Sequence, residues 1–248
     1  MISIITATYN SAKTIEQTLK SVLNQSYTEY EYIIVDGDSS DSTLEIIKKY
    51  IIPFNGKLKY ISEPDNGIYD AWNKGINMAK GEWICFVGSD DILYENALEN
   101  YYNKIRYSNK NINFISSKIE LVTNDLKTIK IVGEPWSNKM KNHCTIAHVG
   151  AMHKIDLFRR FGVYSLEYQI CSDYEFLLRN YNYIIPEYLD VITAKMRIDG
   201  VSNNRVYLVL KETYKIKNKC SSFFIKFFNF IYYTKALIGQ LIRSSVNN

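Results

Sequence analysis

Along the first 90 residues, short continuous apolar runs alternate with segments in which apolar residues recur every three or four positions. The continuous runs predict buried strands over 2–7, 32–35, 58–61 and 83–87. The periodic segments between them predict helices over 12–25, from 44 onward, and over 68–79. Strands that alternate with helices in this way build βαβ units, so we expect an α/β fold whose sheet is mostly parallel and flanked by helices.

The second half of the chain has a weaker pattern. It predicts strands over 112–122, 128–132, 148–153 and 188–196, and helices over 155–161 and from 172 or 173 onward. Residues 139–143 are expected to form a mobile loop. We place one domain over residues 1–204 and a tail over 205–248.

Polar clusters follow all four of the early strands. They are Thr8 to Ser11, Asp36 to Asp38, Asp65 with Asn66, and Ser89 to Asp91. An acidic pair standing alone, such as Asp90 and Asp91, would most simply cap the helix that follows it. Ligands of parallel sheets, however, bind outside the carboxyl ends of the strands, and four such clusters favour one shared binding site.

The phosphate chemistry of such a site would need help from a metal ion. The chain has no G-x-G-x-x-G after its first strand and no G-x-x-x-x-G-K-[ST], so the dinucleotide and P-loop classes are excluded. Mg²⁺ or Mn²⁺ binds readily to one or two carboxylates together with phosphate oxygens. The turn from Ser89 to Asp91 is therefore the candidate metal site.

Composition indicates the cellular compartment of the protein. A chain with 46% hydrophobic and 23% charged residues folds as a globular protein. Its four cysteines show no C-x-x-C spacing, which favours a reducing compartment over a zinc or redox site. The N-terminal residues lack the basic segment and cleavage site of a secretory signal. These features predict a cytoplasmic protein.

Charge separates the tail from the body. Residues 205–248 carry a net charge of +7, whereas residues 1–204 carry −3. The segment 223–242 is rich in aromatic residues, and its polar side chains gather on one side of a helical wheel. Lys226 and Lys235 argue against a membrane span, so we predict an amphipathic helix on an anionic membrane surface, at the inner face of the plasma membrane. Packing on the body or a dimer contact is the alternative.

The first 90 residues resemble the family 2 glycosyltransferases of the GT-A fold, which build bacterial surface polysaccharides. The matching stretches are Ile4 to Asn10, Tyr32 to Gly37, Ser62 to Asp70, Asn73 to Ile76, Gly81 with Glu82, and Gly88 to Asp91. Similarity continues more faintly through His148 and the stretch Ser172 to Glu175.

The resemblance implies roles at individual positions. Tyr9 would lie against the nucleotide base, and Asp36 would accept a hydrogen bond from the ring N–H of the base. Asp90 would contact the ribose or the metal shell, and Asp91 would ligate the metal. Asp173 matches the catalytic base. The full set of candidates for nucleotide-sugar binding is Thr8, Tyr9, Asn10, Asp36, Asp65, Lys74 and Asp90.

Some of these assignments have a simpler reading. Asp173 could merely cap its helix, and Lys74 could be an exposed helical lysine rather than a phosphate ligand. His148 is a candidate on the acceptor side, whereas His153 is expected to pack on a neighbouring strand. Gly88 departs from the family, whose metal motif usually begins with an Asp at this position.

Together these observations predict a metal-dependent, inverting, hexosyltransferase-type enzyme. It would move a sugar from a nucleotide donor, for which we expect UDP, to a lipid-linked glycan. The expected cofactor is Mg²⁺ or Mn²⁺, and no nucleic-acid partner is expected. A non-catalytic nucleotide-sugar-binding protein of the same fold is the alternative. A sugar nucleotidyltransferase would need a Gly- and Arg-rich phosphate loop near the N-terminus, which the chain lacks.

Overall fold

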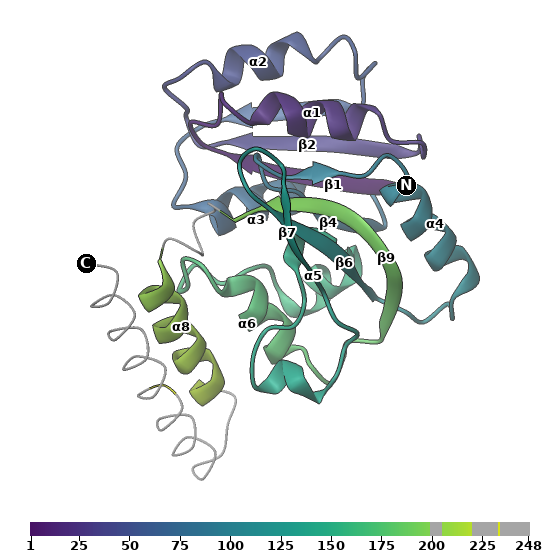
Figure 1. Ribbon diagram of the computed structural model, residues 1–248, viewed down its shortest axis with the longest axis vertical. Coiled ribbons are helices and arrows are strands. Elements are labelled where there is room, and N and C mark those ends of the chain that lie inside the picture. Colours follow the sequence, from purple (N-terminus) through teal and green to yellow (C-terminus); the bar gives the residue numbers. More distant parts are fainter. Residues whose placement is uncertain (199–204, 220–232, 234–248) are drawn as a thin grey trace.

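The computed structural model describes residues 1–198, 205–219 and 233, and Figure 1 shows the arrangement of their helices and strands. The strands are β1 (Ile2–Thr8), β2 (Tyr30–Asp36), β3 (Leu58–Ser62), β4 (Trp83–Phe86), β5 (Ile92–Leu93), β6 (Phe114–Val122), β7 (Thr128–Val132), β8 (Ala151–Lys154) and β9 (Pro186–Arg197). The α-helices are α1 (Ile15–Leu23), α2 (Thr43–Lys49), α3 (Ile68–Met78), α4 (Ala97–Tyr107), α5 (Ile155–Phe161), α6 (Ser172–Arg179) and α8 (Val206–Lys219).

The strands form one sheet in the order β3-β2-β1-β4-β8-β6-β9-β5, with β7 paired to β6. The four strands β3, β2, β1 and β4 are parallel, as the βαβ pattern predicted. Antiparallel pairing begins where β8 joins β4 and continues through β6, while β6 and β9 pair in parallel. The predicted α/β class with a GT-A-like sheet is confirmed, and the second half makes the sheet a mixed one.

Alternating residues of the central strands pack into two separate hydrophobic cores, one on each face of the sheet. Ile5, Ile33 and Phe86 face one layer, which contains α3, α5, α6 and the buried side of α8. Ile4 and Ile34 face the other layer, which contains α1, α2 and α4. This alternation is the two-residue period of a strand covered on both faces, and it explains why the strands read as continuous apolar runs.

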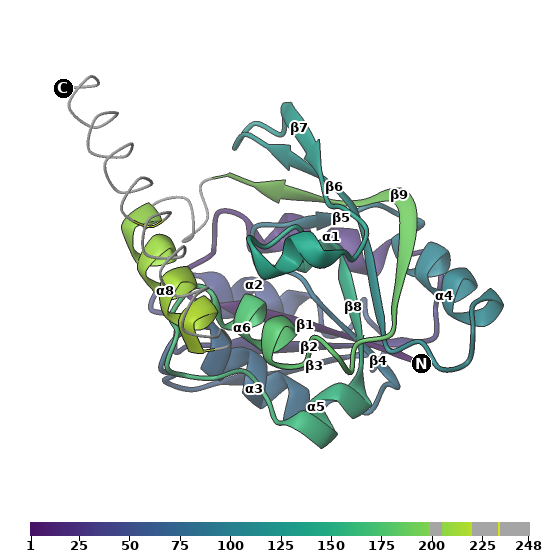
Figure 2. The same ribbon diagram turned by 90° about the horizontal axis from the view of Figure 1, so that it is seen from below.

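Two segments of the second half differ from their predictions. Residues 139–143, expected as a loop, contain the 3-10 helix η1 (Asn138–Lys141), because the fully buried Met140 anchors them in the core. Only the later part of the predicted strand 148–153 pairs with β4, since η2 (His148–Gly150) is a turn of 3-10 helix. The β6–β7 hairpin projects from the sheet (Figure 2).

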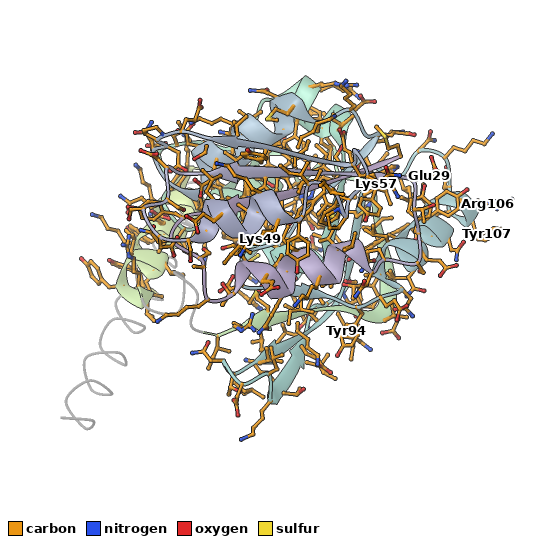
Figure 3. All side chains as sticks on the ribbon, turned by 90° about the horizontal axis from the view of Figure 1, so that it is seen from above. Glu29, Lys49, Lys57, Tyr94, Arg106 and Tyr107 are labelled. Carbon is orange, nitrogen blue, oxygen red and sulfur yellow. The ribbon has the colours of Figure 1, made fainter. Side chains whose placement is uncertain are left out.

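The opposite edge of the sheet, where β2 begins, carries charged residues with structural partners. The Lys57 ammonium donates to the Thr28 carbonyl over 2.8 Å, and Lys57 lies beside Glu29 (Figure 3). The predicted polar clusters lie at the other edge, where the parallel strands β1 to β4 end.

The first part of the predicted tail packs on the body. Helix α8 buries Ile216, which is 1% exposed, in the same core as α6, and the two helices lie side by side in Figures 1 and 2. The predicted amphipathic segment 223–242 lies, apart from Tyr233, outside the described residues. Within the described ranges, no helix combines the length and apolarity that crossing a bilayer requires.

Candidate active site at the carboxyl edge of the sheet

The ends of β1 and β2 lie side by side and start the site. Thr8 and Asp36 are register partners in the parallel ladder, and the N–H of Gly37 donates to the Thr8 carbonyl over 2.9 Å. The Thr8 hydroxyl is buried and has no hydrogen-bond partner within the part of the chain that the structure describes. A buried hydroxyl of this kind is available to a ligand at the strand end.

Asp36 is fully buried and is held by hydrogen bonds from the loop after β2 and from the end of β3. Its Oδ2 accepts from the Ser39 N–H over 3.0 Å and from the Ser62 hydroxyl over 2.7 Å. Its Oδ1 accepts from the Ser39 hydroxyl over 2.5 Å. Because a carboxylate offers about four lone-pair sites, Asp36 keeps capacity for one more donor, such as the ring N–H of a base.

Asp65 reaches the same place from the loop after β3. A β-carbon built on Gly37 would lie 2.6 Å from Asp65 Oδ2, so the Asp65 carboxylate approaches this backbone closely because residue 37 is glycine. Asp65 Oδ1 accepts from the Gly67 N–H over 2.8 Å. The acids at positions 36 and 65, far apart in sequence, are thereby brought together.

The loop after β1 presents an open ring. Tyr9 is 65% exposed, which leaves its ring free to lie against a planar ligand. Asn10 adopts a φ of 50°, donates its N–H to the Ser39 hydroxyl over 2.8 Å and accepts from the Ser40 N–H over 2.9 Å. Asn10 therefore braces the loop that carries Tyr9. A direct contact between Asn10 and a nucleotide remains a prediction.

The turn after β4 holds the second acidic pair. Asp91 Oδ2 accepts from the Gly88 N–H over 3.1 Å, and the hydroxyls of Ser89 and Ser11 are 2.8 Å apart. The Thr18 hydroxyl, on α1, donates to the Asp91 carbonyl over 2.7 Å. These contacts fix the turn from both the loop after β1 and the first helix.

Buried charge makes this turn a suitable site for a cation. Asp91 is buried, and both its desolvation and the neighbouring Asp90 carboxylate raise its pKa. Desolvation likewise raises the pKa of Asp90. Two neighbouring carboxylates, one buried and one half-buried, require a positive charge in order to ionise together. The donor set fits Mg²⁺ or Mn²⁺ that takes its remaining ligands from phosphates and water, and the described residues contain no cluster of three or more acids, histidines or cysteines that could hold a metal alone.

Arg197 supplies part of that positive charge, and it was not among the residues predicted for the site. Its guanidinium is 5% exposed, donates to the Asp90 carbonyl, and donates to Gln17 Oε1 over 2.6 Å. No local signal marks Arg197, because β9 also carries Glu187, Asp190 and Lys195. Arg197 ties the end of β9 to the acidic turn.

Asp173 lies in a second group of side chains, built by α3, α6 and η2. Its Oδ1 accepts from the Tyr69 hydroxyl over 2.9 Å, and its Oδ2 lies 3.9 Å from His148 Nδ1. The side chain is 22% exposed, so one carboxylate oxygen remains accessible. Burial, followed by the charge of Asp173, raises the pKa of Tyr69, which therefore stays protonated as a donor. Tyr69 is the other residue that sequence reasoning missed, although it lies inside a matching stretch.

His148 connects the two groups. Its ring stacks on Phe86, at the end of β4, with centroids 5.0 Å apart, and lies 4.5 Å from the ring of Trp72. Desolvation by burial lowers the pKa of His148 although Asp173 opposes the shift. A neutral His148 thus lies between Asp173 and the strand that leads into the acidic turn. His153 packs among phenylalanine rings, as expected.

Lys74 is engaged with protein groups. Its ammonium lies 2.8 Å from a Glu63 carboxylate oxygen and 3.9 Å from Asp70, and it donates to the Pro64 carbonyl over 2.9 Å. A phosphate would have to compete with these contacts. The assignment of Lys74 to a phosphate remains a prediction, and its observed contacts brace the loop that carries Asp65.

An α/β protein with acids at its parallel strand ends, a cation-accepting turn and a partly exposed carboxylate beside them has the organisation of an enzyme that handles a phosphorylated substrate. Residues 3–162 match the family described as glycosyl transferase family 2, and the chain belongs to this family. It is a nucleotide-sugar-dependent glycosyltransferase of the GT-A type, and the resemblance seen in the sequence is confirmed.

Its relatives come from several bacteria. A PGL/p-HBAD biosynthesis glycosyltransferase of Mycobacterium bovis is 28% identical over 214 residues, which span 83% of this chain and 80% of the relative. The poly(ribitol-phosphate) beta-N-acetylglucosaminyltransferase TarP of Staphylococcus aureus is 37% identical over 117 residues, which span 45% of this chain and 35% of TarP.

Solved structures share the fold. Staphylococcus aureus TarS 1-349 in complex with UDP-GlcNAc superposes with a TM-score of 0.70 at 22% identity, covering 87% of this chain and 64% of that chain. The mannosyltransferase PcManGT of Pyrobaculum calidifontis, in complex with GDP-Man and Mn²⁺, superposes with a TM-score of 0.69 at 16% identity, covering 89% and 65%. The chain therefore spans less than two thirds of these solved proteins, although it covers most of its mycobacterial relative.

Proposed function

We propose that the protein transfers a sugar from a UDP-sugar to a glycan acceptor with inversion at the anomeric carbon, and that Asp173 is the general base. The observation that carries the proposal is the partly exposed Asp173 carboxylate, held by Tyr69 and His148 beside the acid-bearing strand ends. A general base must lie within reach of the hydroxyl whose proton it removes, and the 22% exposure of the Asp173 side chain supports such a contact.

The donor lies along the strand ends. The exposed ring of Tyr9 stacks on the base, Asp36 accepts from the ring N–H, and the Thr8 hydroxyl binds nearby. The complex of one structural neighbour with UDP-GlcNAc supports a UDP-sugar as the donor. The complex of another neighbour with GDP-Man makes a GDP-sugar the alternative donor.

Asp91, assisted by Asp90, would hold Mg²⁺ or Mn²⁺, and the Mn²⁺ complex of one structural neighbour supports this assignment. When bound, the ion offsets the negative charge that develops on the departing diphosphate. The chain itself holds the Asp91 carboxylate through the Gly88 N–H, and it fixes the backbone carbonyls of Asp91 and Asp90 through Thr18 and Arg197.

Transfer needs Asp173 in its ionised form. The carboxylate removes the proton from the acceptor hydroxyl as that oxygen attacks the anomeric carbon and the bond to the diphosphate breaks. Tyr69 keeps Asp173 oriented in both protonation states. When Asp173 is ionised, the Tyr69 hydroxyl donates to its carboxylate. When Asp173 is protonated, the Tyr69 hydroxyl donates to the Ile170 carbonyl 2.5 Å away and accepts from the carboxylic acid.

A lipid-linked glycan is the acceptor that suits a basic, aromatic tail. Residues 205–248 carry a net charge of +7, and such segments bind anionic lipid surfaces. Sedimentation with vesicles of phosphatidylglycerol and phosphatidylcholine tests this part. The full chain is expected to sediment with them, and a chain ending at residue 219 to remain in solution.

The variant Asp173→Asn tests the catalytic assignment. It is expected to lower kcat at least 1,000-fold, because the amide cannot accept the proton, while the affinity for UDP-sugar with Mn²⁺ changes less than about twofold. A coupled assay of UDP release measures kcat, and calorimetry measures binding. Full transfer by Asp173→Asn would disprove the base assignment, and binding without any transfer by the wild-type protein would favour the non-catalytic alternative.

A further inference from the structure

The carboxylate of Glu212, on α8, is buried in the loop that leads to Asp173. Its Oε1 accepts from the Gln169 N–H over 2.7 Å, and its Oε2 accepts from the N–H groups of Ile170 and Cys171 over 3.0 and 2.9 Å. Glu212 is 6% exposed. Three successive backbone N–H groups that point at one place form an anion-binding concavity. Here the Glu212 carboxylate fills it, although Glu212 lies at least 41 residues further along the chain.

The three residues bound by Glu212 control the position of Asp173. Cys171 is the N-terminal cap residue of α6, and Asp173 is the second residue of that helix. The carbonyl of Ile170 accepts the hydrogen bond from Tyr69 that alternates with the one to Asp173. A shift of this backbone would therefore move both the carboxylate and its donor.

Glu212 is held in place by the packing of α8. Ile216 and Val209 contact the core, and the Lys217 ammonium donates to the Asn142 carbonyl over 2.9 Å. The Thr213 hydroxyl lies 3.8 Å from the Cys171 sulfur. The helix thus presents the carboxylate from a fixed position. Glu167, by contrast, contacts Lys215 and Lys219 of the same helix on the surface.

We propose that Glu212 is a positioning residue for glycosyl transfer: it fixes the backbone of residues 169–171 so that Asp173 faces the acceptor. The inference rests on Asp173 as the proposed base. It makes α8 part of the catalytic machinery, although this helix contributes no group to the donor site. Donor binding and transfer should therefore respond differently to a change at residue 212.

The test compares Glu212→Gln with Glu167→Gln in the full chain. In the first variant an NH₂ group replaces one acceptor oxygen and faces the backbone donors, so kcat is expected to fall at least 10-fold while the KM for UDP-sugar changes less than about twofold. Glu167→Gln alters only the exposed ion pairs of Glu167 with Lys215 and Lys219 on α8, and it should leave kcat within about twofold. Glu212→Asp keeps the charge on a shorter side chain and should give an intermediate kcat, and it serves in place of Glu212→Gln if that variant does not fold.

Two further measurements separate positioning from general destabilisation. A core variant in the other layer, Ile47→Ala, should lower the thermal midpoint by at least as much as Glu212→Gln and yet keep kcat. In the Asp173→Asn background, Glu212→Gln should cause no additional loss of the residual transfer, because residues that act as a unit are not additive.

The outcomes distinguish this inference from the proposed function. A wild-type kcat in Glu212→Gln, a parallel loss of donor affinity, or an additional loss in the Asp173→Asn background would overturn the positioning role and leave the base assignment intact. Full transfer by Asp173→Asn alone would overturn the base assignment, and with it the claim that Glu212 acts through Asp173.

Discussion

At the scale of single residues, Gly88 explains how the carboxylates of Asp90 and Asp91 both fit against the backbone of the acidic turn. A β-carbon at this position would lie 2.6 Å from Asp91 Oδ2 and 2.9 Å from Asp90 Oδ1. The space that a side chain would fill is thus occupied by the two carboxylates that follow. The glycine that departs from the family motif is therefore a packing requirement of this turn, and the carboxylates of Asp90 and Asp91 approach the backbone because of it.

Gly88→Ala should disturb cation and donor binding without unfolding the protein. The added methyl group must displace the Asp91 carboxylate from the Gly88 N–H, so Mn²⁺-dependent binding of UDP-sugar is expected to weaken at least 10-fold. Calorimetry measures the affinity. Ser89→Ala, which adds no atom to the same turn, should weaken it less than about threefold. Equal effects of the two variants would contradict the steric explanation.

The sequence predicted the acids of the site better than their partners. Asp36, Asp65 and Asp91 could be identified because each follows a strand that is recognisable from its local pattern. Tyr69 and Arg197 could not, because their partners Asp173 and Asp90 lie 104 and 107 residues away. Only the folded chain brings these pairs together.

At the scale of elements, β9 links the antiparallel half of the sheet to the acidic turn. It pairs with β6 in parallel over most of its length and with β5, which follows the turn, in the antiparallel sense. Arg197 is its last residue and contacts both the turn and α1. Through Arg197, β9 thus places one buried positive charge where it meets the acidic turn and α1.

Arg197→Met should destabilise the protein because it leaves the Asp90 carbonyl and Gln17 without their donor. The free energy of unfolding is expected to fall by about 3 kcal/mol, as found when one member of a buried polar group is removed. Urea denaturation measures the change. Lys195→Met, on the same strand with its ammonium over the Tyr94 ring, should cost less than about 1 kcal/mol. A loss no larger than that of the control would show that Arg197 is dispensable.

Elements were predicted well where apolar runs and helical spacing were long. The strands β1 to β4 and the helices between them agree with their predictions to within a few residues. The turn η1 was not predictable, because it depends on one buried side chain, Met140, and on the Tyr174 hydroxyl that donates to the Met140 carbonyl over 2.7 Å. No periodic pattern records such contacts.

At the scale of the whole molecule, a pair of buried histidines connects stability to pH. His153 lies among phenylalanine rings, and its Nδ1 has no hydrogen-bond partner among the described residues. Burial, followed by the neighbouring His148, lowers the pKa of His153 well below its usual value of 6.5. The unfolded chain therefore takes up protons at a higher pH than the folded protein does, and stability is lost as the pH falls below about 6.5.

Replacing His153 should flatten this dependence. Between pH 8 and pH 5 one such histidine lowers the free energy of unfolding by about 2 kcal/mol, and His148 adds to the loss in the same direction. His153→Phe is expected to remove that contribution, as measured by urea denaturation at several pH values. His143→Gln, at an exposed position, should leave the dependence unchanged. An unaltered pH profile in His153→Phe would contradict the prediction.

The two-layer organisation of the body was predictable from the sequence, whereas the place of α8 was not. The change of charge at residue 205 suggested a separate tail, but the chain continues to share the core through Ile216. A charge pattern describes the exposed face of a helix and does not reveal which apolar side chains are buried beneath it.

The contact between Glu212 and residues 169–171 also sets the order in which the enzyme matures during synthesis. The strand ends that bear Asp36 and Asp65 are synthesised within the first 65 residues. The loop before Asp173 receives its last partner only after residue 212, about 10 s later at ordinary rates of translation. A chain interrupted in that interval would lack the Glu212 contact to residues 169–171, so we expect transfer to begin only when the polypeptide is nearly finished.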